Sequence, residues 1–345
     1  MQSRRYFLVF TPYQLMTCLN IALSNSDNIN TFIFVNKSVA KYVDLCRKQG
    51  VNVEVYEELF TQDRGSGTLT KYLSIFFNIF KVLYVLKHLP ISFNNVDELL
   101  VPSDDIICRA TYKLLKKRNK NLVLSLFDDG VGTYGGNVFR KKNKLGAFIY
   151  SLLLNNDYCD RIAYLYCYQK NLVKNIPSTI QVITIHNNTK IIRVLFNLTD
   201  EVIEMYRGVK VLFLDQGLTY DEINSCLHIL YERFHEAFAI KAHPRISPSN
   251  YSGYRVINDG IPIEAIISSC LEPNCLLISH CSGGCISSFI MGGDANFSAI
   301  FLTDIIKNDA WSQVTTGYIR GLISEINASN VYIPTSIEEF CELIK

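Results

Sequence analysis

Residues 122–130 read LVLSLFDDG, an apolar run that passes directly into Asp128, Asp129 and Gly130. A short apolar run that ends in turn residues predicts a buried strand of a parallel sheet. In open α/β sheets, ligands bind beyond the carboxyl ends of the strands, so this acidic pair lies where a substrate would. Neighbouring residues of an extended chain point in opposite directions, so we expect one carboxylate to face the substrate and the other to brace the loop.

Two interpretations of the acidic pair stay open. Burial beside a like charge raises the pKa of a carboxyl group, which would give a general base able to deprotonate an acceptor. Asp-Gly is also common turn chemistry, and in that case the pair has no catalytic role.

Short apolar runs of this kind alternate with longer segments of helical periodicity along all 345 residues. The alternation predicts parallel sheets covered by helices, an α/β fold. The predicted strands are Tyr6–Phe10, Thr31–Val35, Val51–Val55, Glu98–Val101, Leu122–Phe127, Ile162–Tyr166, Val209–Leu214, Ala237–Lys241, Leu276–Ser279 and Ala299–Leu302. Helices are predicted near Tyr220–Arg233, Ile263–Leu271 and Gly284–Met291, and Ser103, which two acids follow, is the expected N-cap of another.

The strand pattern restarts after a polar segment within Ile185–Asp200. We therefore expect two Rossmann-like domains, residues 1–195 and 196–345, and two such domains facing each other across a cleft are the simplest architecture. The last helix is expected to pack back on the first domain, and a homodimer stays open.

Composition and charge exclude several classes of protein. Apolar residues make up 48% of the chain, with 20 Tyr and 20 Phe, so the chain buries a large core and is not disordered. The net charge of +2 is too small for a protein that tracks nucleic-acid phosphates, so no nucleic-acid partner is expected. Residues 1–195 nevertheless carry 25 basic and 14 acidic side chains, net +11, whereas residues 196–345 carry 9 and 18, net −9.

The cysteines and the hydropathy pattern indicate the compartment. The eleven cysteines are scattered, mostly in apolar runs, and lack the paired spacing of a zinc site, so we expect reduced core residues and no metal. No stretch reaches the ~18 uncharged apolar residues of a membrane span. We expect a cytoplasmic protein, either soluble or attached peripherally to the inner face of the membrane.

A second candidate cluster follows the predicted strand Ala237–Lys241 and consists of Lys241, His243, Pro244 and Arg245. A histidine held by a proline and flanked by two cations suits an anionic ligand, above all a phosphate whose leaving charge must be stabilised or protonated. A structural histidine between solvated cations is the alternative interpretation.

A third cluster, Ser279-His280-Cys281-Ser282-Gly283-Gly284, joins a predicted strand to a predicted helix. Small residues there let N–H groups and hydroxyls approach a phosphate at the start of the helix, so Ser279, Ser282 and Gly283 are candidate phosphate ligands. A plain tight turn at the glycine pair is the alternative. The spacing is neither a Walker loop nor a dinucleotide GxGxxG, and no G-x-S-x-G elbow is present.

Two further features lie near these clusters in sequence. Glu264 opens a predicted helix, where a carboxylate could accept hydrogen bonds from ribose hydroxyls or simply complement the helix dipole. Gln216 and Gly217 follow a predicted strand, where a glycine allows the backbone to approach a ligand closely.

The order of these motifs resembles that of bacterial sialyltransferases. Asp128-Asp129-Gly130 is similar to their acidic-acidic-Gly motif, His243-Pro244 to their His-Pro motif and Ser282 to their serine motif. With Thr11-Pro12-Tyr13-Gln14 after the first strand, the chain most resembles glycosyltransferase family 52, the lipooligosaccharide and capsule sialyltransferases. The resemblance covers roughly residues 6–300.

The resemblance implies a GT-B fold and a metal-independent, inverting transfer of sialic acid from CMP-sialic acid to a galactose-containing glycan, either free or lipid-linked, with no cofactor. One aspartate of the pair, with Asp129 preferred over Asp128, would be the general base, and His243 would protonate or stabilise the departing CMP phosphate. The implied donor-side residues are Ser282, Gly283, Ser279, Glu264, which would bind the ribose, Lys241, Pro244, Arg245, Gln216 and Gly217; those on the acceptor side are Thr11, Pro12, Gln14 and Gly130.

The sequence departs from the family at one motif, and rival functions stay open. Cys281 stands where the family often has a second hydroxyl, so Ser279 could replace that contact. The same chemistry would serve a transferase for another CMP-linked keto-sugar such as Kdo, or one that extends polysialic acid. A catalytically silent nucleotide-sugar-binding protein would need the phosphate site but no base.

Basic residues beside an apolar helix predict contact with an anionic membrane surface. The apolar segment is Ala147–Leu154, and the basic residues are Lys113, Lys116, Lys117, Arg118, Lys120, Arg140, Lys141, Lys142 and Lys144. An ordinary solvated face beside a core helix is the alternative.

Overall fold

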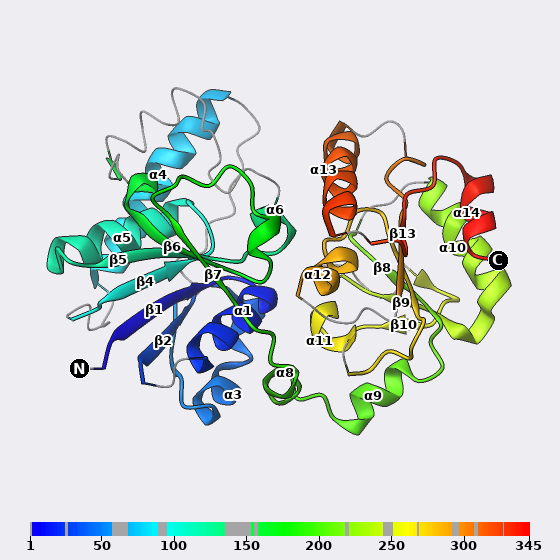
Figure 1. Ribbon diagram of the computed structural model, residues 1–345, viewed down its shortest axis with the longest axis horizontal. Coiled ribbons are helices and arrows are strands. Elements are labelled where there is room, and N and C mark those ends of the chain that lie inside the picture. The colour runs from blue at the N-terminus through cyan, green and yellow to red at the C-terminus, as the bar shows by residue number, and fades with distance from the viewer. Residues whose placement is uncertain are drawn as a thin grey trace. The chain divides into compact units, whose positions relative to one another are not determined.

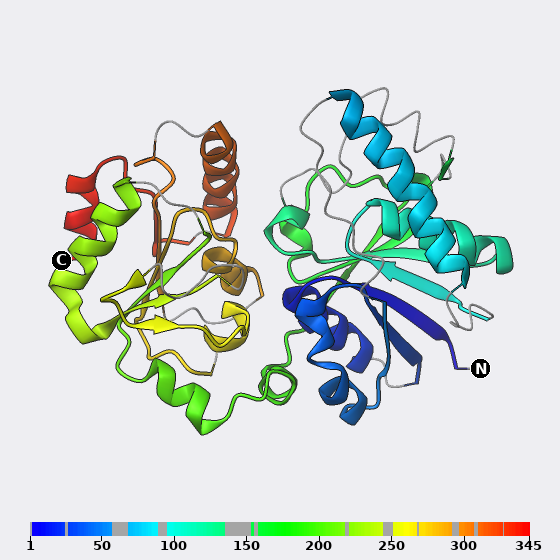
Figure 2. The same cartoon turned by 180° about the vertical axis from the view of Figure 1, so that it is seen from behind.

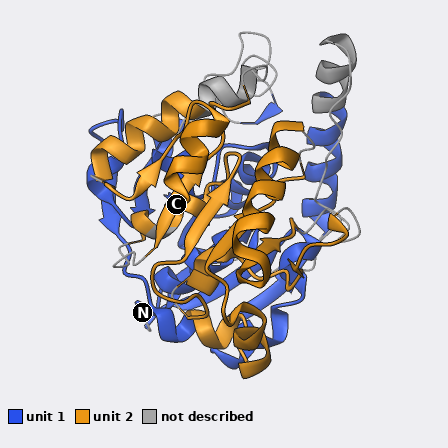
Figure 3. Ribbon diagram, turned by 90° about the vertical axis from the view of Figure 1, so that its right-hand side faces the viewer, with its two compact units in different colours: residues 1–191 blue, residues 192–345 orange. Residues whose placement is uncertain are grey.

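The computed structural model describes residues 2–24, 27–56, 68–88, 95–134, 153–154, 158–217, 221–243, 251–267, 269–291, 297–306, 310–326 and 328–345. The chain divides into two compact units, residues 1–191 and residues 192–345 (Figure 3). The division falls close to the boundary predicted after residue 195. Each unit has its own parallel sheet and its own core.

Unit 1 is built on a seven-stranded parallel sheet in the order β3-β2-β1-β4-β5-β6-β7 (Figure 1). Its strands are β1 (Arg4–Val9), β2 (Ile29–Phe34), β3 (Asn52–Val55), β4 (Glu98–Val101), β5 (Val123–Phe127), β6 (Ile162–Cys167) and β7 (Gln181–Thr184). The first six lie within two residues of their predicted positions. The seventh was not predicted, because an edge strand is only half-buried and its sequence QVIT carries no apolar run.

Helices cover both faces of this sheet (Figures 1 and 2). One face packs against α4 (Thr68–His88) and α5 (Ile106–Arg118), and the other against α1 (Pro12–Leu23). The remaining helices of the unit are α2 (Lys37–Ala40), α3 (Val43–Lys48), α6 (Val131–Tyr134) and the short 3₁₀ turns η2 (Cys159–Arg161) and η3 (Lys170–Leu172). The sheet is therefore buried on both faces, which explains why its inner strands are mainly apolar runs rather than alternating patterns.

The N-cap of α5 corrects a prediction. Asp105, not Ser103, is the N-cap, because its side chain accepts a hydrogen bond from the Cys108 N–H at 2.8 Å. The Ser103 hydroxyl instead donates to Asp105 at 3.2 Å. The serine therefore supports the capping carboxylate and does not itself begin the helix.

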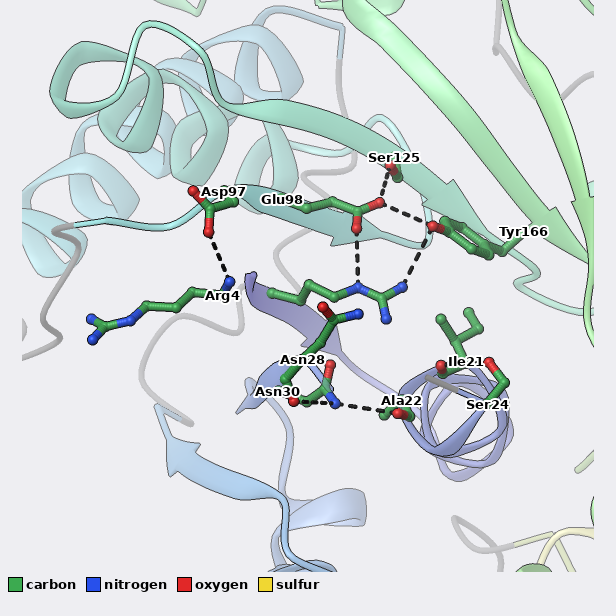
Figure 4. Close-up of polar contacts among 11 residues, drawn as sticks. Arg4, Ile21, Ala22, Ser24, Asn28, Asn30, Asp97, Glu98, Ser125 and Tyr166 are labelled. Carbon is green, nitrogen blue, oxygen red and sulfur yellow. Dashed lines mark hydrogen bonds and ion pairs between the residues drawn. The ribbon is translucent and has the colours of Figure 1, made fainter. Parts of the chain in front are cut away.

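A buried polar network ties four strands of the sheet together on the α1 face (Figure 4). Arg5 Nε donates to Glu98 Oε2 at 3.0 Å, and Arg5 is 4% exposed. The other carboxylate oxygen, Oε1, accepts from Ser125 at 2.6 Å and from the Tyr166 hydroxyl at 3.3 Å. Because β1, β4, β5 and β6 each contribute one of these side chains, the network favours this strand order over others.

Unit 2 is built on a six-stranded parallel sheet in the order β10-β9-β8-β11-β12-β13. Its strands are β8 (Val211–Leu214), β9 (Phe238–Lys241), β10 (Val256–Ile257), β11 (Leu276–Ser279), β12 (Ser298–Phe301) and β13 (Val331–Tyr332). The four inner strands lie within two residues of their predicted positions. The two edge strands were missed because each has only two residues.

The helices of unit 2 are α8 (Thr189–Leu195), which crosses the division, α9 (Asp200–Tyr206), α10 (Asp221–Phe234), η4 (His235–Ala237), α11 (Ile263–Ile267), α12 (Gly284–Ile290), α13 (Ala310–Ile326) and α14 (Ile337–Leu343). Of these, α10, α11 and α12 were predicted from the sequence. α11 ends earlier than the predicted Leu271. Among the described residues, no helix is both long and apolar enough to cross a bilayer. All eleven cysteines are without disulfides, and nine of them are buried.

Candidate active site

Asp128 follows β5 and is completely buried. Its Oδ1 accepts hydrogen bonds from the Gly130 N–H at 2.7 Å and the Tyr13 hydroxyl at 3.1 Å, and its Oδ2 accepts one from the Tyr134 hydroxyl. Burial raises the pKa of Asp128 to about 6, although the hydrogen bonds from Tyr134, Gly130 and Tyr13 oppose the rise. Both oxygens of this carboxylate therefore accept hydrogen bonds that hold the turn in place.

Asp129 is exposed, so the two carboxylates diverge as the alternation of an extended chain predicts. The Gln14 amide Nε2 donates to Asp129 Oδ1, and the Asp129 N–H donates to the Thr133 hydroxyl at 2.9 Å. An exposed carboxylate with a fixed orientation at the carboxyl end of a strand is placed to accept a proton from a bound ligand.

Thr11, Pro12 and Gln14 form the N-terminus of α1. The Thr11 hydroxyl accepts from the Gln14 N–H at 3.2 Å, and Gln14 Oε1 accepts from the Thr11 N–H at 3.2 Å and the Phe10 N–H at 2.7 Å. These contacts make a capping box with proline at the first helical position. The side-chain amide of Gln14 therefore links this segment to Asp129. The predicted contact of Thr11, Pro12 and Gln14 with a glycan acceptor stays a prediction.

Gly130 has a φ of +95°, a conformation that side chains rarely adopt. This conformation allows the chain to turn back so that the Gly130 N–H reaches the carboxylate of Asp128. Gly130 therefore shapes the turn, and its predicted place beside an acceptor stays untested.

In unit 2 the corresponding turn is Asp215-Gln216-Gly217, directly after β8. Asp215 is buried, and it accepts hydrogen bonds from the Gly217 N–H at 2.7 Å, the His243 N–H at 3.3 Å and the Tyr251 hydroxyl. Gln216 Oε1 accepts from the Cys281 N–H at 2.7 Å. Because β8 and β11 flank the point where the strand order reverses, this contact joins the two loops that border the switch point of the sheet.

His243 and Lys241 lie at the carboxyl end of β9 but have different surroundings. Asp215 holds the backbone of half-buried His243 beside the switch point. Lys241 forms a buried ion pair with Asp259 and also contacts the Tyr206 hydroxyl at 2.8 Å. Burial lowers the pKa of Lys241, and the Asp259 carboxylate opposes that change.

This arrangement gives Lys241 a structural partner that was not predicted. Its ammonium neutralises the buried Asp259 carboxylate, while its contact with a phosphate stays a prediction. Two other predicted donor-side residues, Pro244 and Arg245, lie outside the described residues.

The turn from β11 to α12 contains Ser279, Ser282 and Gly283. The Ser282 N–H donates to the Ser279 hydroxyl at 3.0 Å, and the Gly284 N–H donates to the Ser282 hydroxyl at 3.3 Å. These N–H groups thus have acceptors within the turn, contrary to the expectation that they point at a ligand. The half-buried Ser282 side chain remains the candidate phosphate contact. Gly283 is the N-cap of α12 and, as a glycine, has no side chain with which to cap the helix.

Gly284 is required by packing rather than by a ligand. A Cβ atom on this residue would lie 2.3 Å from Ile263 Cγ2 and 3.5 Å from Leu214 Cδ1. The first distance is far below van der Waals contact, so α12 approaches α11 as closely as it does only with glycine here.

Glu264 is half-buried in the first turn of α11. Its Oε1 accepts from the Ser287 hydroxyl of α12 at 2.6 Å. Burial raises the pKa of Glu264, and the hydrogen bond from Ser287 opposes the rise. A carboxylate so oriented can accept hydrogen bonds from a diol, which is the role predicted for it.

Sequence reasoning missed the residues that hold these side chains in place. Tyr13 and Tyr134 bind Asp128, and Tyr206 and Asp259 bind Lys241. Tyr206 and Asp259 belong to no motif, and Tyr13, although part of the quoted Thr11–Gln14 segment, lies far from Asp128 in sequence. Tyr134 is close to Asp128 in sequence, but only the fold shows that its hydroxyl reaches the carboxylate. Within the described residues, no group of three His, Cys, Asp or Glu side chains is arranged to hold a metal ion.

No protein-family profile and no curated protein matches the chain. Many solved structures are similar to nearly all of it, and three of them illustrate the likeness. A Methanocaldococcus jannaschii UDP-GlcNAc 2-epimerase, bound to UDP-GlcNAc and UDP, matches 99% of this chain over 91% of its own, with 12% identity and a TM-score of 0.54. CalG4, the calicheamicin glycosyltransferase, matches 100% over 89% of its own chain, with 11% identity and a TM-score of 0.56.

The third is Arabidopsis thaliana UGT89C1 complexed with UDP-L-rhamnose, which matches 96% of this chain over 85% of its own, with 12% identity and a TM-score of 0.55. At such identities the likeness establishes the fold alone. Two helix-covered parallel sheets and these neighbours confirm the predicted architecture: the chain has the two-domain, Rossmann-like GT-B fold.

Proposed function

We propose that this chain is a glycosyltransferase that moves sialic acid from CMP-sialic acid to a terminal galactose-type hydroxyl of a bacterial surface glycan, such as lipooligosaccharide, O-antigen or capsule. The reaction inverts the anomeric centre and needs neither a metal nor another cofactor. The fold supports the general part, because a glycosyltransferase and a nucleotide-sugar epimerase share it. The motif order supports the choice of donor.

The observation that carries the proposal is the division of labour within the acidic pair. Asp128 is buried and accepts three hydrogen bonds from its own unit, whereas Asp129 is exposed and oriented by Gln14. A turn that served only structure would need the first carboxylate alone. The second is therefore the candidate general base.

In this mechanism the acceptor hydroxyl attacks the anomeric carbon of sialic acid and gives its proton to Asp129. A new carbon–oxygen bond forms as the bond from that carbon to the CMP phosphate breaks, and CMP leaves with the electron pair. His243 protonates or stabilises the phosphate, Ser282 holds it, and Glu264 binds the ribose. Meeting the leaving charge with a cation and fixed dipoles lowers the barrier to departure.

The test is CMP release from CMP-sialic acid with lactose as acceptor, in the presence of a chelator. We expect turnover by the wild-type protein and a loss of about a hundredfold or more for Asp129→Asn, as is usual when a general base is removed. His243→Ala should also slow turnover. Asp44→Asn is the matched control, since this carboxylate belongs to the same unit and is 88% exposed.

Several outcomes would contradict the proposal. Unchanged turnover by Asp129→Asn would show that Asp129 is not the general base. Strict dependence on a divalent ion would rule out the metal-independent mechanism. Turnover of CMP-Kdo but not of CMP-sialic acid would reassign the donor. Binding of CMP-sialic acid without turnover would favour a silent binding protein.

A further inference from the structure

The helix α4 presents apolar side chains on its outer face as well as on its inner face. Ile79, Val82 and Leu86 point into the core of unit 1 and are completely buried. The other face carries Phe76, Phe77, Phe80 and Tyr84, which are 40%, 67%, 48% and 67% exposed. We call these four the aromatic ridge.

The aromatic ridge is an ordered surface. The rings of Phe76 and Phe80 lie 4.7 Å apart between centroids, and Phe77 packs edge-on against Phe76 at 6.2 Å. One turn further on, Tyr84 packs on the His88 ring at 4.3 Å. A contiguous exposed aromatic stripe of this kind marks an interaction surface, because single exposed apolar residues are common but clusters of them are not.

The charged side chains of α4 are all basic. The sequence of α4, TLTKYLSIFFNIFKVLYVLKH, contains three lysines and no acid. Lys81, Lys87 and His88 are exposed beside the ridge. The neighbouring helix α5 packs against α4 and ends in Lys116, Lys117 and Arg118. Figure 2 shows the carboxyl ends of both helices at the same edge of the sheet.

We propose that the aromatic ridge and its lysines dock on the surface of an anionic lipid bilayer. Aromatic rings prefer the headgroup level of a membrane, and lysines beside them bind lipid phosphates while their apolar stems stay on the helix. A second copy of the chain fits this face less well, because a two-fold interface would bring the same lysines together. The proposal does not depend on the transferase activity.

This surface differs from the membrane contact predicted from the sequence. Residues 140–144 and most of 147–154 lie outside the described residues. Of the predicted basic residues in α5, Lys113 donates to the Leu153 carbonyl at 2.7 Å and Lys116 to the Leu122 carbonyl at 3.3 Å. These two ammonium groups therefore bind backbone carbonyls of unit 1, and we place the docking face on α4 instead.

The test is sedimentation of the full chain with phosphatidylcholine vesicles, with and without phosphatidylglycerol, in low and high salt. We expect binding only to the anionic vesicles and release by salt. Replacing both Lys81 and Lys87 by Gln should weaken binding about thirtyfold, because each lysine near an anionic surface contributes about 1 kcal/mol of binding free energy and the two contributions add. Replacing Phe77 and Tyr84 by Ser, which keeps the charge, should weaken it about tenfold or more.

The control is the pair Met205→Ser and Lys210→Gln in unit 2, where an exposed methionine and lysine should be replaceable without effect. Circular dichroism checks that each variant is folded. Equal binding to both vesicle types, or wild-type binding by the α4 variants, would overturn the proposal. So would a vesicle-free dimer that the Phe77 and Tyr84 substitutions dissociate. Since no donor is present, none of these outcomes bears on the transferase proposal.

Discussion

Each unit uses the same three-residue turn after an inner strand, Asp128-Asp129-Gly130 after β5 and Asp215-Gln216-Gly217 after β8. In both, a buried aspartate accepts a hydrogen bond at 2.7 Å from the N–H of the glycine two residues later. Both glycines have positive φ, +95° and +72°. The backbone solution is the same, and only the middle residue differs.

The middle residue shows how one turn serves two purposes. In unit 1 it is an exposed carboxylate that another side chain orients, whereas in unit 2 it is a half-buried amide that accepts the Cys281 N–H and joins two loops. Because the flanking aspartate and glycine already hold the backbone of the turn, the turn itself does not require a particular side chain at the middle position. It can hold a reactive group in one unit and a brace in the other.

The largest expected effect separates the buried aspartates from the middle residues. Asp128→Ala leaves the donors of Tyr13, Tyr134 and Gly130 without an acceptor, so it should lower the free energy of unfolding by about 3 kcal/mol. Asp215→Ala should cost about as much, because it also accepts three hydrogen bonds. Asp129→Ala should cost less than about 1 kcal/mol. Urea unfolding measures all three.

The next effect uses pH to isolate Asp128. Its native pKa of about 6 lies above the ordinary 3.8, so the folded protein holds this proton more tightly than the unfolded chain does. Its stabilising contribution is complete below about pH 4 and is lost as the pH rises through 6. The difference in unfolding free energy between the wild type and Asp128→Asn should therefore fall by about 3 kcal/mol from pH 4 to pH 7. A constant difference would mean that Asp128 does not titrate in this range.

The smallest effect tests whether the two glycines are equivalent. Gly130→Ala should lower stability by about 1 kcal/mol, because the conformation is strained for alanine while the added Cβ meets the Tyr13 ring only at an ordinary 3.7 Å. Gly217→Ala should cost a similar amount. Gly132→Ala is the control, since that residue lies in α6 with open space around it. A neutral Gly130→Ala beside a costly Gly217→Ala would show that the two turns are not alike.

The buried strands were predictable from sequence because their signal is local. Runs such as Leu122–Phe127 are apolar at every position but Ser125, since helices cover both faces of the sheet. The edge strands β7, β10 and β13 carry no such signal, because pairing with a neighbour rather than burial makes them strands.

The candidate site was predictable only in part, for the same physical reason. The acidic pair and the His-Pro motif stand out because they follow apolar runs directly. The buried ion pair of Lys241 could not be predicted, because its partners Asp259 and Tyr206 come near it only in the folded chain. Local sequence also could not tell that the N–H groups of the β11–α12 turn already have acceptors within it.

Gln14 has a consequence for how this sequence can drift. A capping box accepts Glu or Gln at its third position equally well. Here the side-chain oxygen of Gln14 already accepts two N–H groups, so the nitrogen must face Asp129. A glutamate would keep the helix cap but set a second negative charge against that carboxylate. If Asp129 is the base proposed above, the glutamine at position 14 is needed for the site as well as for the helix cap, so Gln14→Glu should lower turnover while leaving the helix cap intact.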